Sequence, residues 1–293
     1  MRGRSKGLMA AVLLLLAAVH VAVFIQVWWF FVHTRRGQQL DTLGLAGNSI
    51  GRDRVDGITD TVLNAMSVAS LAIATAVIVF IALIRRRIML ALMAALLVLG
   101  ANLTTQLVKY LTVRPDLGID PERAGAGNSL PSGHTAVAAS VAVALVLVVP
   151  ARVRGLAAVL GAAYAAVAGV ATLSAGWHRP SDAVASLLMV GAWAAFAGFV
   201  LVLTQPASAE MEPGAGHRLA VTLLALAGVL LLAAAAVALT VNEPVSAIPP
   251  EELSRRRLSV AYGGGAAAIA GTAALVMALV LAPVHRVVLR RTG

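Results

Sequence analysis

The sequence predicts an all-α fold, a polytopic bundle of transmembrane helices. Of the 293 residues, 60% are hydrophobic and 12% are charged, and the mean hydropathy is +0.89. Soluble domains are about half apolar and about a quarter charged, so this composition indicates a protein built for lipid. The apolar residues form separate runs of spanning length, without the alternating pattern of a membrane β-barrel. Helices are expected because a backbone in lipid must satisfy its own hydrogen bonds.

Eight apolar runs are candidate membrane spans. A signal peptide is the alternative for the first run, but its length and the lack of a clear small-x-small cleavage site favour an uncleaved helix. The stretch Gln205–His217 contains two prolines and is the best linker. It divides a six-span core, residues 1–205, from a two-span C-terminal extension, residues 206–293. The eight runs are Leu8–Val32, Thr61–Ile84, Ile88–Tyr110, Thr135–Val149, Leu156–Ala175, Ala183–Thr204, Leu219–Val241 and Val260–Val284.

Basic residues in the short loops predict the orientation of the spans. With eight spans, these loops all lie on one side, which the positive-inside rule makes cytoplasmic. Further arginines at 35, 36, 52, 54 and 255–257 lie in the other loops and weaken the bias. We expect a bacterial-type inner (plasma) membrane protein with both termini in the cytoplasm and a polar loop, residues 33–60, on the outer face. The residues that set this orientation are Arg2, Arg4, Lys6, Arg85, Arg86, Arg87, Arg152, Arg154, Arg290 and Arg291.

The composition also excludes several kinds of site and partner. The chain has no cysteine, which excludes disulfides, iron–sulfur clusters and thiolate zinc sites. The net charge of +10 comes largely from arginines between apolar runs, which is typical of topology signals and of contacts with anionic lipid. No basic stripe with interleaved aromatic residues occurs, so we expect the lipid bilayer and not nucleic acid as a partner. Nothing in the sequence indicates the oligomeric state.

The first chemistry-bearing segment is Pro131-Ser132-Gly133-His134, immediately before an apolar run. It predicts a tight turn that leaves free N–H groups at a helix N-terminus, a geometry that binds anions. A plain serine N-cap with a glycine turn is the structural alternative. That alternative leaves His134 unexplained.

The second segment is His178-Arg179-Pro180-Ser181-Asp182, which also begins a helix, with Pro180 near its first position. His178 and Asp182 are four residues apart and share one face if the turn is helical. Asp182 can then hold one imidazole N–H and leave the other ring nitrogen nucleophilic. A solvated histidine beside a capping aspartate is the alternative.

Two cations precede these segments. Lys109 ends the third apolar run, and Arg114 follows it. A snorkelling lysine is a common structural feature, but the planar guanidinium of an arginine suits bidentate contact with phosphate oxygens. Ionisable groups gathered at the ends of three consecutive spans are costly and usually functional. Their conjunction with two histidines predicts a phosphate site.

These residues resemble the type 2 phosphatidic acid phosphatase family, which shares its site with vanadium haloperoxidases and glucose-6-phosphatase. The family pattern is Lys, six residues, Arg-Pro; then Pro-Ser-Gly-His; then Ser-Arg, five residues, His, three residues, Asp. This chain matches the middle piece and the His178-x-x-x-Asp182 end fully, and the resemblance is clearest over residues 60–205.

The chain departs from the family pattern in two places. Only four residues separate Lys109 from Arg114, and Ala171-Thr172 stands where the third piece has Ser-Arg. One phosphate-binding arginine is therefore missing, and Arg179 or Arg123 is the candidate to replace it.

The resemblance implies a lipid phosphatase that needs neither metal nor cofactor and acts at the extracytoplasmic face on a polyprenyl or glycerolipid phosphate or pyrophosphate. It implies that His178, oriented by Asp182, forms a phosphohistidine and that His134 protonates the leaving group. The phosphate oxygens would be held by Lys109, Arg114, Ser132 and Gly133, with Arg179 a weaker candidate.

Three alternatives stay open. A catalytically degraded lipid-binding or regulatory membrane protein is suggested by Thr172, and a lipid phosphotransferase would use the same chemistry. A small-solute transporter is the third, but this chain places its charges at helix ends and not near mid-bilayer.

Overall fold

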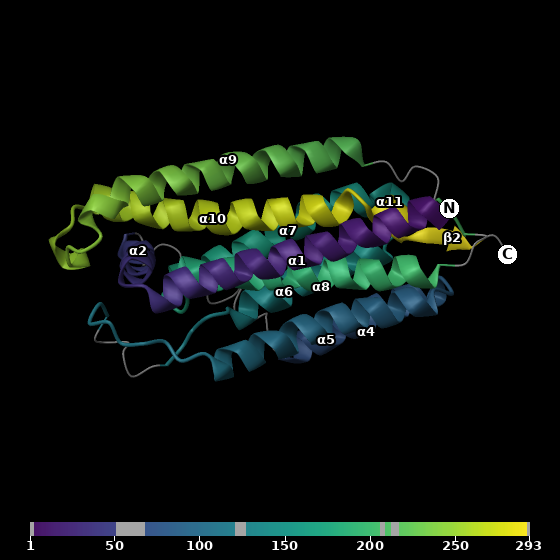
Figure 1. Cartoon of the computed structure of the whole chain (residues 1–293), viewed down its shortest axis with the longest axis horizontal. Helices are drawn as coiled ribbons and strands as arrows, with labels where there is room; N and C mark the ends of the chain where they lie inside the picture. Colours follow the sequence, from purple (N-terminus) through teal and green to yellow (C-terminus); the bar gives the residue numbers. More distant parts are fainter. Residues whose placement is uncertain (1–2, 51–67, 121–126, 206–208, 212–216, 292–293) are drawn as a thin grey trace.

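The structure is a computed structural model that describes residues 3–50, 68–120, 127–205, 209–211 and 217–291. Long helices run side by side along one axis (Figure 1). They are α1 (Gly3–His33), α4 (Val68–Ile84), α5 (Ile88–Leu111), α6 (Gly133–Val148), α7 (Ala151–Ser174), α8 (Pro180–Thr204), α9 (Arg218–Asn242) and α10 (Arg255–Leu281).

Each long helix coincides with one of the eight apolar runs, which confirms the all-helical bundle predicted from the sequence. Six helices of the described part are long and apolar enough to cross a membrane. The apolar helices Ser70–Ile84 and Gly133–Val148 are shorter. The chain is therefore a multi-pass membrane protein, and the count of eight spans stays a prediction. The run expected from Thr61 lies partly outside the described residues, as do Arg52 and Arg54.

The prediction of a polar loop over residues 33–60 is wrong for its first part. Residues Arg35–Ala46 form helix α2, and Gly47–Ser49 form the 3₁₀ helix η1. The Thr34 side chain caps α2 by accepting a hydrogen bond from Gly37 N at 3.0 Å. Apolar side chains spaced along α2, such as Leu40 and Leu43, are buried where the helix packs against α1, α8 and α10. Burial of this apolar face outweighs the polar composition of the segment.

Several short elements complete the chain. The 3₁₀ turns η3 (Glu243–Val245) and η4 (Pro250–Glu252) join α9 to α10, and α11 (Val284–Val287) follows α10. Strands β1 (Ala209–Met211) and β2 (Leu289–Arg291) pair antiparallel. The segment expected to be a plain linker is thus attached to the end of the chain by a small sheet.

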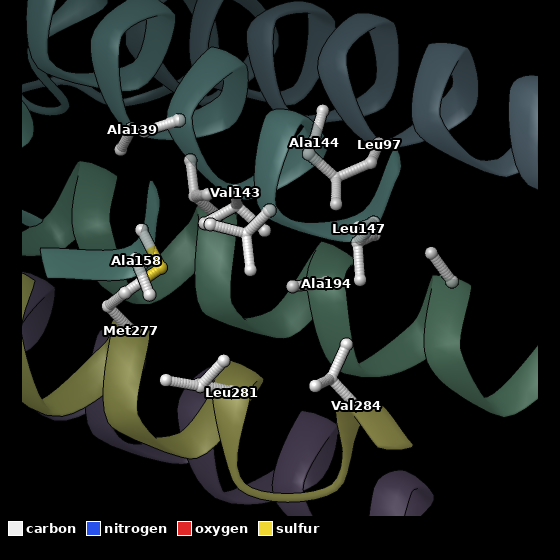
Figure 2. Packing of buried hydrophobic residues seen from close by; sticks show 14 of the residues in the cluster. Leu97, Ala139, Val143, Ala144, Leu147, Ala158, Ala194, Met277, Leu281 and Val284 are labelled. Atoms are coloured by element: carbon white, nitrogen blue, oxygen red, sulfur yellow. The ribbon is translucent and has the colours of Figure 1, made fainter. Parts of the chain in front are cut away.

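The core is built largely from alanine with a few larger side chains. Ala144, Ala158 and Ala194 are buried next to Leu147 and Met277 (Figure 2). Small residues let membrane helices approach closely, and van der Waals packing then stabilises the bundle. Helix α10 packs against α7, α8 and α2 as well as against α9. The division between residues 205 and 206 therefore does not coincide with a gap in packing, and an independent six-span core stays a prediction.

The long helices run along one axis, so the segments that connect them lie at the two ends of the bundle (Figure 1). One end, here called the motif end, holds α2, the C-terminal end of α5 and the N-terminal ends of α6 and α8. The opposite end holds the short basic loops, where Arg85 donates to the Val148 carbonyl and Lys6 donates to the Leu203 carbonyl at 2.9 Å. The arrangement matches the separation of basic loops from motifs that the sequence predicts.

Candidate active site

The N-terminus of α8 positions the second histidine. Pro180 is the first helical residue, and Asp182 Oδ2 accepts a hydrogen bond from the Arg179 backbone N at 3.0 Å. The same oxygen lies 3.2 Å from His178 Nδ1. This is the contact that the four-residue spacing predicts. Asp182 is fully buried, so the imidazole is held by a carboxylate shielded from solvent.

The N-terminus of α6 is joined to that of α8. Ser132 is the N-cap residue of α6 and is completely buried, and its Oγ accepts hydrogen bonds from the Thr135 N–H and hydroxyl groups. Ser132 N donates to the Asp182 carbonyl at 3.0 Å. Ser186 Oγ lies 2.7 Å from the Ser132 carbonyl and 3.0 Å from the Asp182 carbonyl. Ser132 therefore has the N-capping role that the sequence offered as the structural alternative. Its backbone also holds the first motif against the second.

His134 sits in the first turn of α6 and is only partly buried. Its ring lies 5.4 Å, centroid to centroid, from that of Trp177, the exposed residue before His178. The charges of His178 and Lys109 act on His134, so these three residues belong to one electrostatic cluster. The cluster combines two imidazoles and an ammonium at the motif end of the bundle.

Arg114 reaches the buried carboxylate from the loop after α5. Its Nη1 donates to the Phe31 carbonyl at 3.2 Å, and its Nη2 lies 3.8 Å from Asp182 Oδ1. Burial lowers the pKa of the Arg114 guanidinium, while the Asp41 and Asp182 carboxylates oppose that shift. Its Nε and Nη2 have no hydrogen-bond partner within the described ranges. Arg114 keeps its positive charge, as arginine does in proteins, with donors to spare for an anion.

Position 172, where the family pattern has an arginine, holds a threonine. Thr172 is completely buried, and its hydroxyl donates to the Gly169 carbonyl within α7. Arg179, the first suggested replacement, donates from Nη2 to Asp120 Oδ2 at 2.8 Å and from Nη1 to Ser129 Oγ at 3.4 Å. Arg123, the second, lies outside the described residues. The guanidinium of Arg179 is thus already engaged by a carboxylate.

Sequence reasoning missed Asp41, a buried carboxylate on α2. Its Oδ1 accepts from Ser181 N at 3.1 Å and its Oδ2 accepts from Ser181 Oγ at 2.5 Å. Burial, together with the nearby Asp182 charge, raises the pKa of Asp41 to about 6, although Arg114 and Ser181 oppose the shift. Asp41 therefore holds the start of α8 one residue before Asp182. In the sequence, the local indication of a helix here was Thr34, a possible N-cap, followed by a segment with leucines at helical spacing.

Comparison with known proteins finds a similarity in the central part of the chain. A model of the PAP2 superfamily matches residues 90–208, a segment that contains every site residue predicted from the sequence. The curated proteins and the solved structures contained no match to the chain.

Proposed function

From the match of residues 90–208 to the model of the PAP2 superfamily, we propose that this multi-pass membrane protein is a lipid phosphatase with its reaction centre at His178. The observation that carries the proposal is the contact of 3.2 Å between His178 Nδ1 and Asp182 Oδ2. With its proton on Nδ1, the ring donates to the carboxylate and keeps an unprotonated Nε2. That nitrogen is the nucleophile.

The reaction has two steps. In the first, His178 Nε2 forms a bond to phosphorus while the bond from phosphorus to the lipid oxygen breaks, and His134 gives its proton to the leaving oxygen. A pyrophosphate substrate would release a phosphate in place of the alcohol. In the second step, water attacks the phosphohistidine, His134 takes a proton from that water, and inorganic phosphate leaves.

Fixed positive charges stabilise the transferring group. Phosphoryl transfer depends mainly on positioning and on charge stabilisation at the phosphate oxygens. Lys109 and Arg114 supply two cations, and N–H groups at the start of α6, including that of Gly133, would donate to an anion bound there. Ser132 supports the site through its backbone. Arg179 has a secondary role in phosphate binding, since its guanidinium already pairs with Asp120. The motif end faces the extracytoplasmic side, and the lipid tail stays in the bilayer.

Phosphate release by the purified protein tests the proposal with three substrates: a phosphatidate, a phosphatidylglycerol phosphate and a polyprenyl diphosphate. Release of phosphate from at least one is expected, and it should persist in EDTA. Complete loss in EDTA that a divalent cation restores would overturn the assignment of fixed cations. The His178→Ala variant should lose activity by about several hundredfold, the lower scale for removing a catalytic group. His33→Ala, which changes an exposed histidine at the same end, should be active.

Thr172 supports one second candidate, a protein that binds lipid phosphates without turning them over. The arginine expected there is absent, and Arg179 is paired with Asp120. Binding of a lipid phosphate without phosphate release, unchanged in His178→Ala, would favour this function over hydrolysis. Appearance of the phosphate on a second lipid or sugar would identify a phosphotransferase.

A further inference from the structure

A cavity of about 210 Å³ lies at the motif end, between α1, α2, α8, α9 and α10. For comparison, an engineered cavity of about 150 Å³ holds one benzene molecule. The wall is apolar and built mainly from small residues, including Ala235, Ala261 and Gly264. Neither histidine of the proposed reaction lines it, and of its five helices only α8 lies inside the segment matched by the PAP2 family.

The polar part of the wall presents hydrogen-bond acceptors. Asn242 is 2% exposed and donates from Nδ2 to the Ala238 carbonyl at 2.8 Å. Its Oδ1 is buried and lacks a hydrogen-bond partner in the described part of the chain. Asp41 lines the same cavity, and each of its carboxylate oxygens has a second lone pair beyond the bond to Ser181. An unsatisfied buried acceptor is costly, so a donor from a ligand would be stabilising here.

The residues that line the cavity indicate which kind of headgroup fits. The lining residues include no lysine or arginine, and an anionic headgroup would meet the Asp41 carboxylate. An ammonium group brings three protons, whereas only one acceptor of the wall, Asn242 Oδ1, lacks a hydrogen-bond partner in the described part of the chain. A hydroxyl group needs one acceptor for its single proton. Two lining residues of α9, Ala236 and Leu239, are exposed, Leu239 by 40%, and would meet lipid in a bilayer.

We propose that this cavity is a binding site for a neutral membrane lipid with a free hydroxyl group. The hydroxyl donates to Asn242 Oδ1, and a segment of the lipid chain fills the space between α9 and α10. The site stands beside the proposed reaction centre and does not depend on its activity.

Photolabelling of the purified full-length protein in lipid nanodiscs tests the site. The probe is a hexadecan-1-ol that carries a diazirine in mid-chain, and mass spectrometry locates the label. Label is expected in residues 232–239 and 261–268. Ala236→Phe places a bulky ring in the exposed part of the cavity wall and should reduce this label about fivefold or more, the loss expected when a contact worth one hydrogen bond is blocked. Ala234→Phe, at an exposed position of α9 outside the wall, is the matched control. Equal labelling of both variants would overturn the proposal.

The headgroup is tested with two related probes. Asn242→Leu should lower labelling by the alcohol about fivefold and leave labelling by the matching diazirine alkane unchanged. The unlabelled phosphate monoester of hexadecanol should compete poorly. Competition by this ester as strong as that by hexadecanol, or equal labelling of the wild-type protein by the alkane, would contradict a neutral hydroxyl ligand. His178→Ala should be labelled normally, which separates this site from the proposed reaction.

Discussion

At the scale of single residues, Asp41 links the pH dependence of stability to the candidate site. Its pKa rises from 3.8 to about 6 on folding, first through burial and then through Asp182. Between these values the folded protein keeps a proton that the unfolded chain has lost. The stability contributed by this carboxyl is therefore present below pH 3.8, falls as pH rises toward 6 and stays constant above that. This shift in pKa corresponds to a change of about 3 kcal/mol in the free energy of unfolding.

Asp41→Asn removes this titration and retains one acceptor for Ser181. The variant is expected to gain stability relative to the wild type as the pH rises from about 4 to about 7. Thermal unfolding of both proteins in detergent across this range measures the difference. Parallel curves for the two proteins would contradict the raised pKa.

Arg114 provides a second prediction at this scale, for substrate binding. Its guanidinium is buried beside Asp182 and keeps two nitrogen donors without a hydrogen-bond partner among the described residues. Lysine retains the charge but not the planar fork that matches phosphate oxygens. Arg114→Lys should therefore raise KM about tenfold, the cost of one charge-assisted hydrogen bond. Steady-state phosphate release is the measurement, with Arg36→Lys, an exposed arginine paired with Glu243, as control. An unchanged KM would remove Arg114 from the substrate site.

The sequence could predict contacts that depend on local spacing and not those that depend on tertiary packing. The four-residue interval from His178 to Asp182 specifies one helical face, so their contact was predictable. The pairs of Arg179 with Asp120 and of Asp41 with Ser181 join residues 59 and 140 positions apart. No periodicity in the sequence relates such distant positions. The capping role of Ser132 was predictable, whereas its complete burial follows only from the packing of α6 on α8.

At the scale of elements, a hydroxyl adds to the backbone link between the two motif helices. Ser186 on α8 contacts the carbonyl oxygens of Ser132 and Asp182, and it is completely buried. Ser186→Ala should destabilise the protein by about 1 kcal/mol and lower turnover, since the α6 start shifts against α8. Melting temperature and phosphate release are measured together. Thr240→Ala, which removes a hydroxyl bonded only within α9, is the control, and equal effects would contradict a specific link.

The elements themselves were predicted where hydrophobicity alone decides them. The eight apolar runs became eight helices because a backbone in lipid has few other ways to satisfy its hydrogen bonds. Helix α2 was not predicted, because its apolar face is narrow and is buried only by packing against the distant segments α1, α8 and α10. The sheet formed by β1 and β2 also depends on distant segments meeting, which explains its absence from the prediction.

At the scale of the whole molecule, the separation of the two bundle ends leads to a test of orientation. The chain has no cysteine, so one introduced thiol reports its position without further mutation. Ser49, in η1 at the motif end, and Ser5, near the start of α1, are both exposed. If the basic loops are cytoplasmic, a membrane-impermeant maleimide added to intact cells labels Ser49→Cys and not Ser5→Cys until the cells are opened. The reverse pattern would place His134 and His178 on the cytoplasmic side and exclude lipid phosphates of the outer leaflet as substrates.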